Sequence, residues 1–182
     1  MKFSTVLMMS SLLALPAFAA DFKLSSTDIK ANGTLSNAQV FNSFGCSGAN
    51  ISPQLSWSGA PAGTQSYAVT VYDPDAPTGS GWWHWVAINI PASATSIAQG
   101  AGTTEGKALP AGTQQVRTDF GAPGFGGACP PAGDKAHRYI FTVYALKVPK
   151  LDVPTDATAA YAGYNIQGNM LGKASFTAYY GR

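Results

Sequence analysis

Hydrophobic positions along this chain fall into short runs separated by glycine- and proline-rich segments. The three strongest runs are rich in β-branched and aromatic residues and span 67–72, 83–90 and 138–146. Shorter runs of the same kind span 22–25, 55–57 and 174–180. Runs of this length and composition, bounded by turn residues, are typical of β-strands. The pattern therefore predicts a mainly β fold with substantial loops.

Only one segment has the composition of a helix. Residues 157–171 contain good helix formers, with tyrosines at nearly helical spacing, and Thr155 or Asp156 can cap the N-terminus. Residues 121–133, in contrast, are dominated by glycine and proline and cannot hold regular structure. A loop of this length is usually functional.

The first nineteen residues have the pattern of a secretory signal peptide. Lys2 supplies a positive charge, residues 6–15 are apolar, and Ala17 to Ala19 form the small-x-small cleavage pattern. The apolar run is too short to span a bilayer, which takes roughly 20 helical residues. We therefore expect a signal peptide over residues 1–19, one domain over residues 20–182, and a periplasmic protein. No second long apolar segment follows, so no transmembrane segment is expected in the mature protein.

Charge is sparse, because only 11% of the residues are charged and the formal net charge is +2. There is no basic run and no acidic tail. Nucleic-acid-binding proteins show clustered lysine and arginine, and so do polybasic proteins of membrane surfaces. The composition therefore excludes nucleic acid as a partner and argues against a polybasic membrane-surface protein.

Cys46 and Cys129 are the two cysteines of the chain. In an oxidising compartment an even pair of cysteines favours a disulfide. A bridge that closes some 80 residues restricts the unfolded chain by roughly 4–5 kcal/mol on the chain-entropy model. The alternative is a reactive thiol, but neither cysteine lies in a CxxC pair or beside a histidine in the sequence.

The chain has two histidines, and each lies beside a rigid turn. His84 follows the segment Asp73-Pro74-Asp75-Ala76-Pro77, and His137 follows a pair of prolines. In extended backbone Asp73 and Asp75 would point the same way. By the same period of two, His137 and Tyr139 share one face of a strand. Aspartate and proline are also ordinary turn formers, and a lone histidine is often a packing residue. Their occurrence together in two segments nevertheless favours a shared site.

These residue types are compatible with several kinds of site. Two histidines and two aspartates permit a metal site, but no tight ligand motif such as HExxH is present. The GxSxG elbow of serine hydrolases is absent as well. The glycine-containing segment 102–108 has the wrong spacing for a phosphate loop, and residues 119–121 spell the DFG triplet of kinases without its companion motifs.

An anion pocket is the remaining interpretation. A phosphate or carboxylate group would accept hydrogen bonds from His84, His137, the Tyr139 hydroxyl and backbone N–H groups of the glycine-rich loop. Asp73 would orient or charge a histidine and raise its pKa, so that the imidazole donates near neutral pH. Asp75 would pin the loop.

Two longer motifs resemble a known family. Asp73-Pro74-Asp75-Ala76-Pro77 followed by Gly81-Trp82-Trp83-His84-Trp85 resembles the first signature of the phosphatidylethanolamine-binding (PEBP, Raf kinase inhibitor-like) family, and Pro130-Pro131 leading to His137-Arg138-Tyr139 resembles the second. Residues 50–57 are similar to an early strand segment of that family. The amino-acid sequence of these segments is most similar to the bacterial YbhB/YbcL branch of the family, and within that branch to exported YbcL-like members. The resemblance covers residues 22–181.

The resemblance implies an antiparallel Greek-key β-sandwich with few peripheral helices, one of them near the C-terminus. It also implies a pocket for phosphate-like and carboxylate groups. By position, the pocket would be formed by Asp73, Asp75, Ala76, Pro77, Trp82, His84, Pro131, His137 and Tyr139. Cys129 stands near the point where many eukaryotic members have Gly-Ser-Gly, so a bridged Cys129 would stiffen the rim. The kinase-regulating role of eukaryotic members is therefore not carried over.

We therefore expect a non-enzymatic binding protein for a small anionic ligand, which is phosphate, a phospholipid head group or a carboxylate, and no cofactor or metal. Partner proteins, which the sequence does not identify, would be modulated through the same surface, in the periplasm or outside it. Two alternatives remain open at this point. One is an inhibitor of a protease or another enzyme. The other is a hydrolase or lyase with His84 and Asp73 as the acid–base pair, although an evident nucleophile is lacking.

Overall fold

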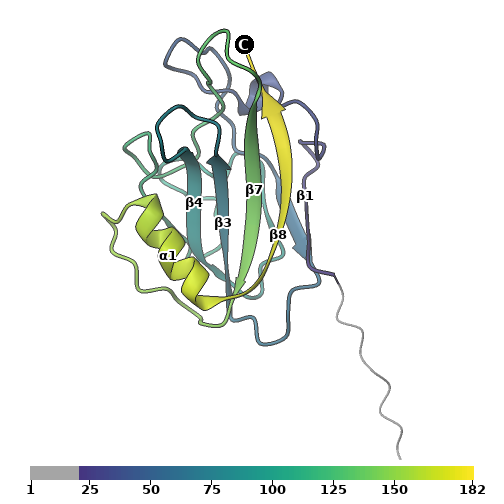
Figure 1. Cartoon of the computed structure of the whole chain (residues 1–182). Helices are drawn as coiled ribbons and strands as arrows, with labels where there is room; N and C mark the ends of the chain where they lie inside the picture. Colours follow the sequence, from purple (N-terminus) through teal and green to yellow (C-terminus); the bar gives the residue numbers. More distant parts are fainter. Residues whose placement is uncertain (1–20) are drawn as a thin grey trace, which may run out of the picture.

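Two antiparallel sheets form the framework of the computed structural model, which describes residues 21–182 (Figure 1). The larger sheet has the strand order β6-β4-β3-β7-β8 and the smaller one β1-β2-β5. The strands of the larger sheet are β3 (Ser66–Asp73), β4 (Trp82–Pro91), β6 (Gln114–Gln115), β7 (His137–Leu146) and β8 (Met170–Tyr180). Those of the smaller sheet are β1 (Lys23–Ser25), β2 (Leu55–Ser58) and β5 (Ser96–Ile97). The expected mainly β fold is confirmed. The signal peptide expected over residues 1–19 lies outside the described residues.

The central strand β3 is apolar along nearly its whole length because both of its faces are covered. Val69 and Val71 pack into a core that also contains Trp57 of the smaller sheet. Ala68 belongs to a second core on the opposite face, beneath the helix. A strand that is buried on both faces reads as a continuous apolar run rather than an alternating one, as this segment does.

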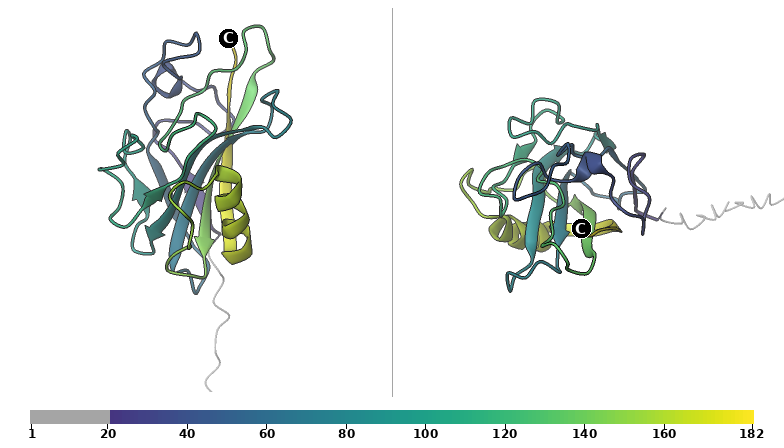
Figure 2. Two further views of the ribbon diagram at one scale, coloured as in Figure 1. Left: turned by 90° about the vertical axis from the view of Figure 1, so that its left-hand side faces the viewer. Right: turned by 90° about the horizontal axis from the view of Figure 1, so that it is seen from above.

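The helix α1 (Ala159–Asn169) covers the second face of the larger sheet near β4 and β7 (Figures 1 and 2). Its Ala162 and Ile166 pack on that face. Thr158 is the N-cap, and its hydroxyl oxygen accepts a hydrogen bond from the backbone N–H of Tyr161 at 3.2 Å. The sequence-based expectation of a cap at 155 or 156 was therefore wrong, because those two residues form a turn ahead of the helix. A further 3-10 turn, η1, spans Asn37–Gln39.

The end of the helix also differs from the expectation. Helix α1 stops at Asn169, and β8 begins directly at Met170 rather than at Ala174. β8 pairs with β7 over its whole length, from Met170 opposite Leu146 to Tyr180 opposite His137. The hydrogen bonds offered by β7 decide this boundary, which local composition does not reveal. No helix in residues 21–182 is long and apolar enough to cross a membrane.

The antiparallel register brings three distant segments to one end of the larger sheet. Asp73, the last residue of β3, lies opposite Trp82, the first residue of β4. On the other side of β3, Tyr72 lies opposite Ile140, close to the start of β7. The C-terminus of the chain lies at this same end, at the top of Figure 1, where long loops gather. The residues singled out by the sequence therefore meet in space because antiparallel neighbours place the end of one strand beside the start of the next.

Candidate functional site

A cavity of about 170 Å³ lies at this end of the sheet. Eight of the nine predicted ligand-binding residues line it, namely Asp73, Ala76, Pro77, Trp82, His84, Pro131, His137 and Tyr139. The remaining wall is formed by Phe44, Thr78, Phe120, Cys129 and Pro130. The cavity thus combines a few buried polar groups with a mostly apolar wall, as binding sites for small molecules commonly do.

Asp75 is the predicted residue that does not line the cavity. Its carboxylate accepts hydrogen bonds from Arg138, at 2.6 Å from Nη2 and at 2.9 Å from Nε and from the backbone N–H. This hydrogen bonding lowers the pKa of Asp75 to about 2. The expectation that Asp73 and Asp75 point the same way was wrong, because the chain turns directly after Asp73 instead of remaining extended. Asp75 ties the turn to β7, which agrees with its expected role in pinning the loop.

Asp73 is buried, with 2% of its surface exposed, and its carboxylate is fully engaged. One oxygen accepts hydrogen bonds from the backbone N–H groups of Asp75 (2.8 Å) and Ala76 (3.2 Å). The other accepts from Nδ1 of His137 at 2.7 Å. A carboxylate accepts only, so His137 carries a proton on Nδ1. Asp73 therefore fixes the tautomer and the ring orientation of His137 while it closes the turn.

His84 is also buried, but it is oriented by a different group. Its Nδ1 lies 2.8 Å from the carbonyl oxygen of Gly126 and must donate to it, because a carbonyl cannot donate. Burial lowers the pKa of His84, and the hydrogen bond to Gly126 and the charge of Asp73 offset only part of this effect. In the neutral imidazole Nε2 is then an acceptor. The charge of Asp73 thus raises the pKa of His84, as expected of a neighbouring aspartate, but burial lowers that pKa by more.

The lowered pKa of His84 leads to a prediction for stability as a function of pH. The unfolded chain takes up a proton on this residue below its ordinary pKa of 6.5, whereas the folded protein resists it. The contribution of neutral His84 is thus complete above pH 6.5, and we expect it to be lost as the pH falls below that value, by at most about 1.4 kcal/mol per pH unit. Urea unfolding of wild type and His84→Gln between pH 5 and 8 measures the difference. Parallel pH profiles for the two proteins would contradict this prediction.

Tyr139 presents a buried hydroxyl that lacks a protein partner. The residue is 1% exposed, and its hydroxyl oxygen makes no hydrogen bond within residues 21–182. Burial raises the pKa of Tyr139, so the phenol stays protonated and able to donate. The backbone of Cys129 lies near the phenol oxygen and lowers this pKa in part, although the two groups do not meet the geometric criteria for a hydrogen bond. Unsatisfied buried polar groups are rare in folded proteins and call for an explanation.

The glycine-rich loop contributes less to the cavity than expected. The backbone N–H of Gly126 donates to the carbonyl of His84 at 2.8 Å, and that of Gly127 donates to the side chain of Asn50 at 2.7 Å. Both N–H groups are thus used within the protein and are not available to an anion. A side chain at Gly127 would collide with backbone atoms of Gln39 and Phe41. The glycines therefore serve close packing of the loop against segment 39–41.

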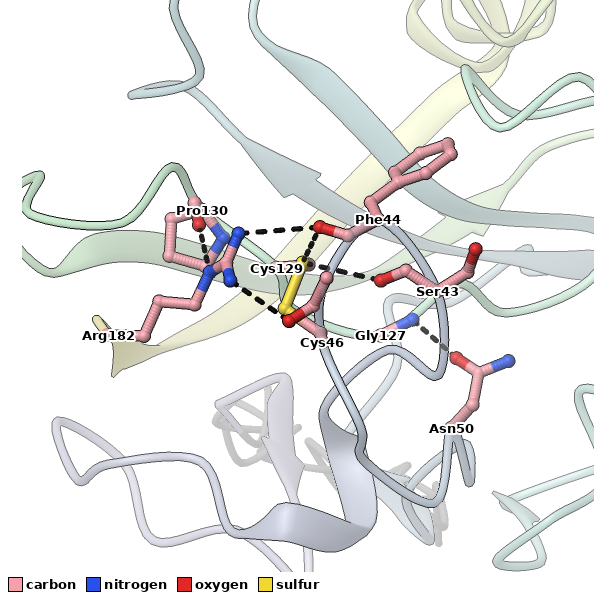
Figure 3. Close-up of a disulfide and its surroundings, with 9 residues drawn as sticks. Ser43, Phe44, Cys46, Asn50, Gly127, Cys129, Pro130 and Arg182 are labelled. Carbon is pink, nitrogen blue, oxygen red and sulfur yellow. Dashed lines mark hydrogen bonds between the residues drawn. A yellow bond between two sulfur atoms is a disulfide. The ribbon is translucent and has the colours of Figure 1, made fainter.

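The rim of the cavity contains a disulfide between Cys46 and Cys129 (Figure 3). The bond joins segment 43–46 to the end of the glycine-rich loop across 83 positions of sequence. Beside it, the guanidinium of Arg182 donates to the carbonyl of Pro130 at 2.7 Å. This is the pairing expected from the sequence, and it places the bridge directly at the mouth of the predicted pocket.

Two aromatic wall residues were not anticipated. Phe44 lies in segment 43–46, and Phe120 lies just ahead of the glycine-rich loop. Phe120 makes edge contacts with His84 (ring centroids 5.3 Å apart) and Trp82 (5.4 Å). Neither phenylalanine belongs to a strand, so no periodicity marked them. Both residues reach the cavity wall because of the conformation of their loops, which the sequence pattern does not predict.

Comparison with known proteins agrees with this architecture. A family model described as phosphatidylethanolamine-binding protein matches residues 25–181, and the chain belongs to this family. The chain is 51% identical to the UPF0098 protein YbcL of Escherichia coli (strain K12) over 177 residues, which cover 96% of this chain and 97% of YbcL. It is also 51% identical to the UPF0098 protein YbhB of the same organism over 156 residues, 86% of this chain and 98% of YbhB.

A solved structure is similar as well. The crystal structure of E. coli YbcL, described as a new member of the mammalian PEBP family, matches with a TM-score of 0.88 and 52% identity, covering 90% of this chain and 99% of that one. The family membership expected from the two sequence motifs is confirmed. Within residues 21–182, no group of three or more histidine, cysteine, aspartate or glutamate side chains is arranged to hold a metal ion.

Proposed function

We propose that this chain is a non-enzymatic binding protein whose cavity takes the phosphate or carboxylate group of a small ligand. The observation that carries the proposal is the Tyr139 hydroxyl, which is buried, protonated and without a protein partner at the cavity wall. A bound oxyanion would accept the hydrogen bond that the protein leaves unmade. Hydrogen bonds to charged acceptors are stronger than neutral ones, so this group favours an anion.

The protonation of the two imidazoles determines which protonation state of the ligand can bind. Nδ1 of His84 and Nδ1 of His137 both donate to the protein. Nε2 of His84 is left for another partner, whereas Nε2 of His137 lies 3.6 Å from the carboxylate of Asp134. An Nε2 atom donates to an oxyanion only when the ring is protonated. A fully ionised ligand would therefore bind with uptake of a proton by an imidazole. A ligand that brings its own proton, such as a phosphate monoanion, would donate to Nε2 directly.

The catalytic alternative now involves different residues. An acid–base pair of His84 and Asp73 does not exist, because Asp73 is bonded to His137. The buried His137–Asp73 pair is the feature that would favour catalysis, since a carboxylate often orients a catalytic imidazole. However, the hydroxyl of Thr78 is donated to the carbonyl of Gly81, and Cys129 is bridged, so neither is an activated nucleophile at this site. Binding therefore fits these groups better than nucleophilic catalysis does.

We further propose that the protein is exported to the periplasm. The disulfide supports this proposal, because such bonds persist in oxidising compartments and are rare in the cytosol. The removable leader expected over residues 1–19 would provide the route. We also propose that partner proteins are modulated through the same surface.

The Tyr139→Phe variant tests the proposed binding site. We expect it to bind inorganic phosphate about tenfold or more weakly than wild type, because a hydrogen bond to a charged group contributes about 1.5–3 kcal/mol. In the unliganded protein the same change removes a hydroxyl without a protein partner, so the free energy of unfolding should stay equal or rise by up to about 1 kcal/mol. Isothermal titration and urea unfolding measure the two effects, which have opposite signs.

The control for this experiment is Tyr144→Phe, on the same strand but in the core beneath the helix. It should leave phosphate binding unchanged. Parallel titrations with phosphoethanolamine and acetate separate phosphate from carboxylate recognition. If wild type, Tyr139→Phe and His84→Ala show the same negligible affinity for every anion, the binding proposal is wrong.

A further inference from the structure

Segment 43–46 is tied to two distant parts of the chain (Figure 3), and its Phe44 lines the cavity. Cys46 is bridged to Cys129 in the wall. The guanidinium of Arg182 donates to the carbonyl oxygens of Gly45 at 3.1 Å and Phe44 at 3.4 Å, and also to that of Pro130. Arginine presents several donors in a fixed planar fork, so one side chain can join segment 43–46 to the opposite rim. The position of this segment is therefore imposed by tertiary contacts.

Phe44 is the residue that this arrangement presents to the cavity. Its side chain is 63% exposed, although phenylalanine is among the most apolar residues, and its φ of 56° is uncommon for a bulky side chain. It lies 5.3 Å from the ring of Phe41 and 6.0 Å from that of Phe120, which it faces in a stacked orientation. A single exposed apolar residue needs no explanation, but one held in an unusual conformation at a cavity mouth does.

The aromatic rings form a continuous wall from solvent to the buried histidine. Phe44 is followed by Phe120, whose ring also meets Trp82 and His84. His84 in turn contacts the ring of Tyr139 at 5.1 Å. The buried imidazole and phenol thus lie at the inner end of the wall, and the ring of Phe44 forms its outer end, beside the Arg182 guanidinium. A ligand that fills both ends must have an anionic group and an apolar body.

The size of the cavity agrees with such a ligand. Its volume is about 170 Å³. An apolar cavity of about 150 Å³ holds benzene, and one water takes about 30 Å³ of liquid volume. A tetrahedral oxyanion of five heavy atoms leaves part of this space empty. An aromatic ring attached to the anion would fill that part and extend outward to the exposed side chain of Phe44.

We propose that the ligand is a small anion with an aromatic substituent, an aryl phosphate or an aryl carboxylate, and that Phe44 is the residue that selects for the ring. Arg182 and the disulfide are positioning elements that keep Phe44 opposite Phe120. This inference rests on the proposed anion-binding function and adds the class of ligand. The phosphate or carboxylate occupies the inner end near Tyr139, and the ring packs against the aromatic wall that Phe44 and Phe120 form together.

The test is the ratio of affinities for phenyl phosphate and methyl phosphate, two monoesters of the same charge, measured by isothermal titration. Aromatic contacts of this kind are each worth about threefold to tenfold in affinity, so wild type should prefer phenyl phosphate by about that factor. We expect the ratio to approach one in Phe44→Ala. In Arg182→Ala the ratio should fall in the same direction, because segment 43–46 loses its two hydrogen bonds from the guanidinium, at Phe44 and Gly45, while Phe44 itself is retained. Benzoate against acetate repeats the comparison for carboxylates.

Tyr164→Ala is the matched control. Tyr164 is an aromatic residue of α1 that is 79% exposed and does not line the cavity, so its removal should leave the ratio unchanged. Thermal melting of each variant verifies folding, and if Phe44→Ala does not fold, Arg182→Ala provides the same ratio. Equal binding of the two monoesters by wild type would overturn this inference and leave the anion site intact. A preference that persists in both variants would also overturn it, and binding of neither ester would refute the anion site as well.

Discussion

Replacement of Cys46 and Cys129 together by serine is expected to lower the free energy of unfolding by about 3–4.5 kcal/mol. The bond joins residues 83 positions apart, and closing a loop of this length removes much of the conformational freedom of the unfolded chain. In a domain of this size such a loss lowers the melting temperature by about 10 °C. Urea unfolding and thermal melting of the double variant beside oxidised wild type measure both quantities.

Reduced wild type is the control for the disulfide prediction. It should match the double variant, and a reductant should not destabilise that variant further. Mass spectrometry of unreduced wild type should find Cys46 and Cys129 in one linked peptide pair. Two free thiols, or a double variant as stable as oxidised wild type, would contradict the prediction.

Asp73→Asn is expected to produce the largest loss at the pocket. The carboxylate accepts hydrogen bonds from His137 and from the backbone N–H groups of Asp75 and Ala76, and it is almost fully buried. The amide places a donor where one of these donors points and leaves a buried group unpaired. We expect a loss of about 3 kcal/mol in the free energy of unfolding and at least tenfold weaker phosphate binding, because His137 loses its fixed tautomer.

Asp75→Asn is a closely matched control, because it makes the same chemical change two residues away. Asp75 and Arg138 form a partly exposed pair, with 31% and 50% of their side chains accessible. Exposed ion pairs contribute about 0–1 kcal/mol, so this variant should lose less than about 1 kcal/mol and keep its affinity for phosphate. Equal effects of the two variants on stability and binding would show that Asp73 has no special role.

Much of the fold was predictable because the strongest strands are specified locally. The runs at 67–72, 83–90 and 138–146 became the centres of β3, β4 and β7, with boundaries shifted by one residue at most ends. The helix boundaries were less accurate, because pairing of β8 with β7 converts Met170 and Leu171 from helix to strand. Local composition specifies which segments are apolar, but neighbouring strands decide where pairing begins.

In the candidate site, too, local sequence predicted some features and tertiary contacts decided the others. His137 and Tyr139 face the cavity together and Arg138 faces away from it, as the period of two predicts for a regular strand. The rule failed for Asp73 and Asp75, because it assumes extended backbone and the chain turns between them. Phe44 could not be found at all, since its position depends on contacts with Cys129 and Arg182, which are remote in the sequence.

The sequence by itself determined the longer strands, the family and the residue types that form the polar end of the cavity, but not the two-residue strands β5 and β6. These features depend on side-chain periodicity and on contiguous motifs, which can be read without coordinates. The tertiary structure decided which histidine Asp73 orients, that Gly126 and Gly127 use their N–H groups internally, and that an aromatic wall meets the buried imidazole of His84. Each of these depends on the distance between groups from different segments, and that distance is set only when the strands pair and the loops close over them.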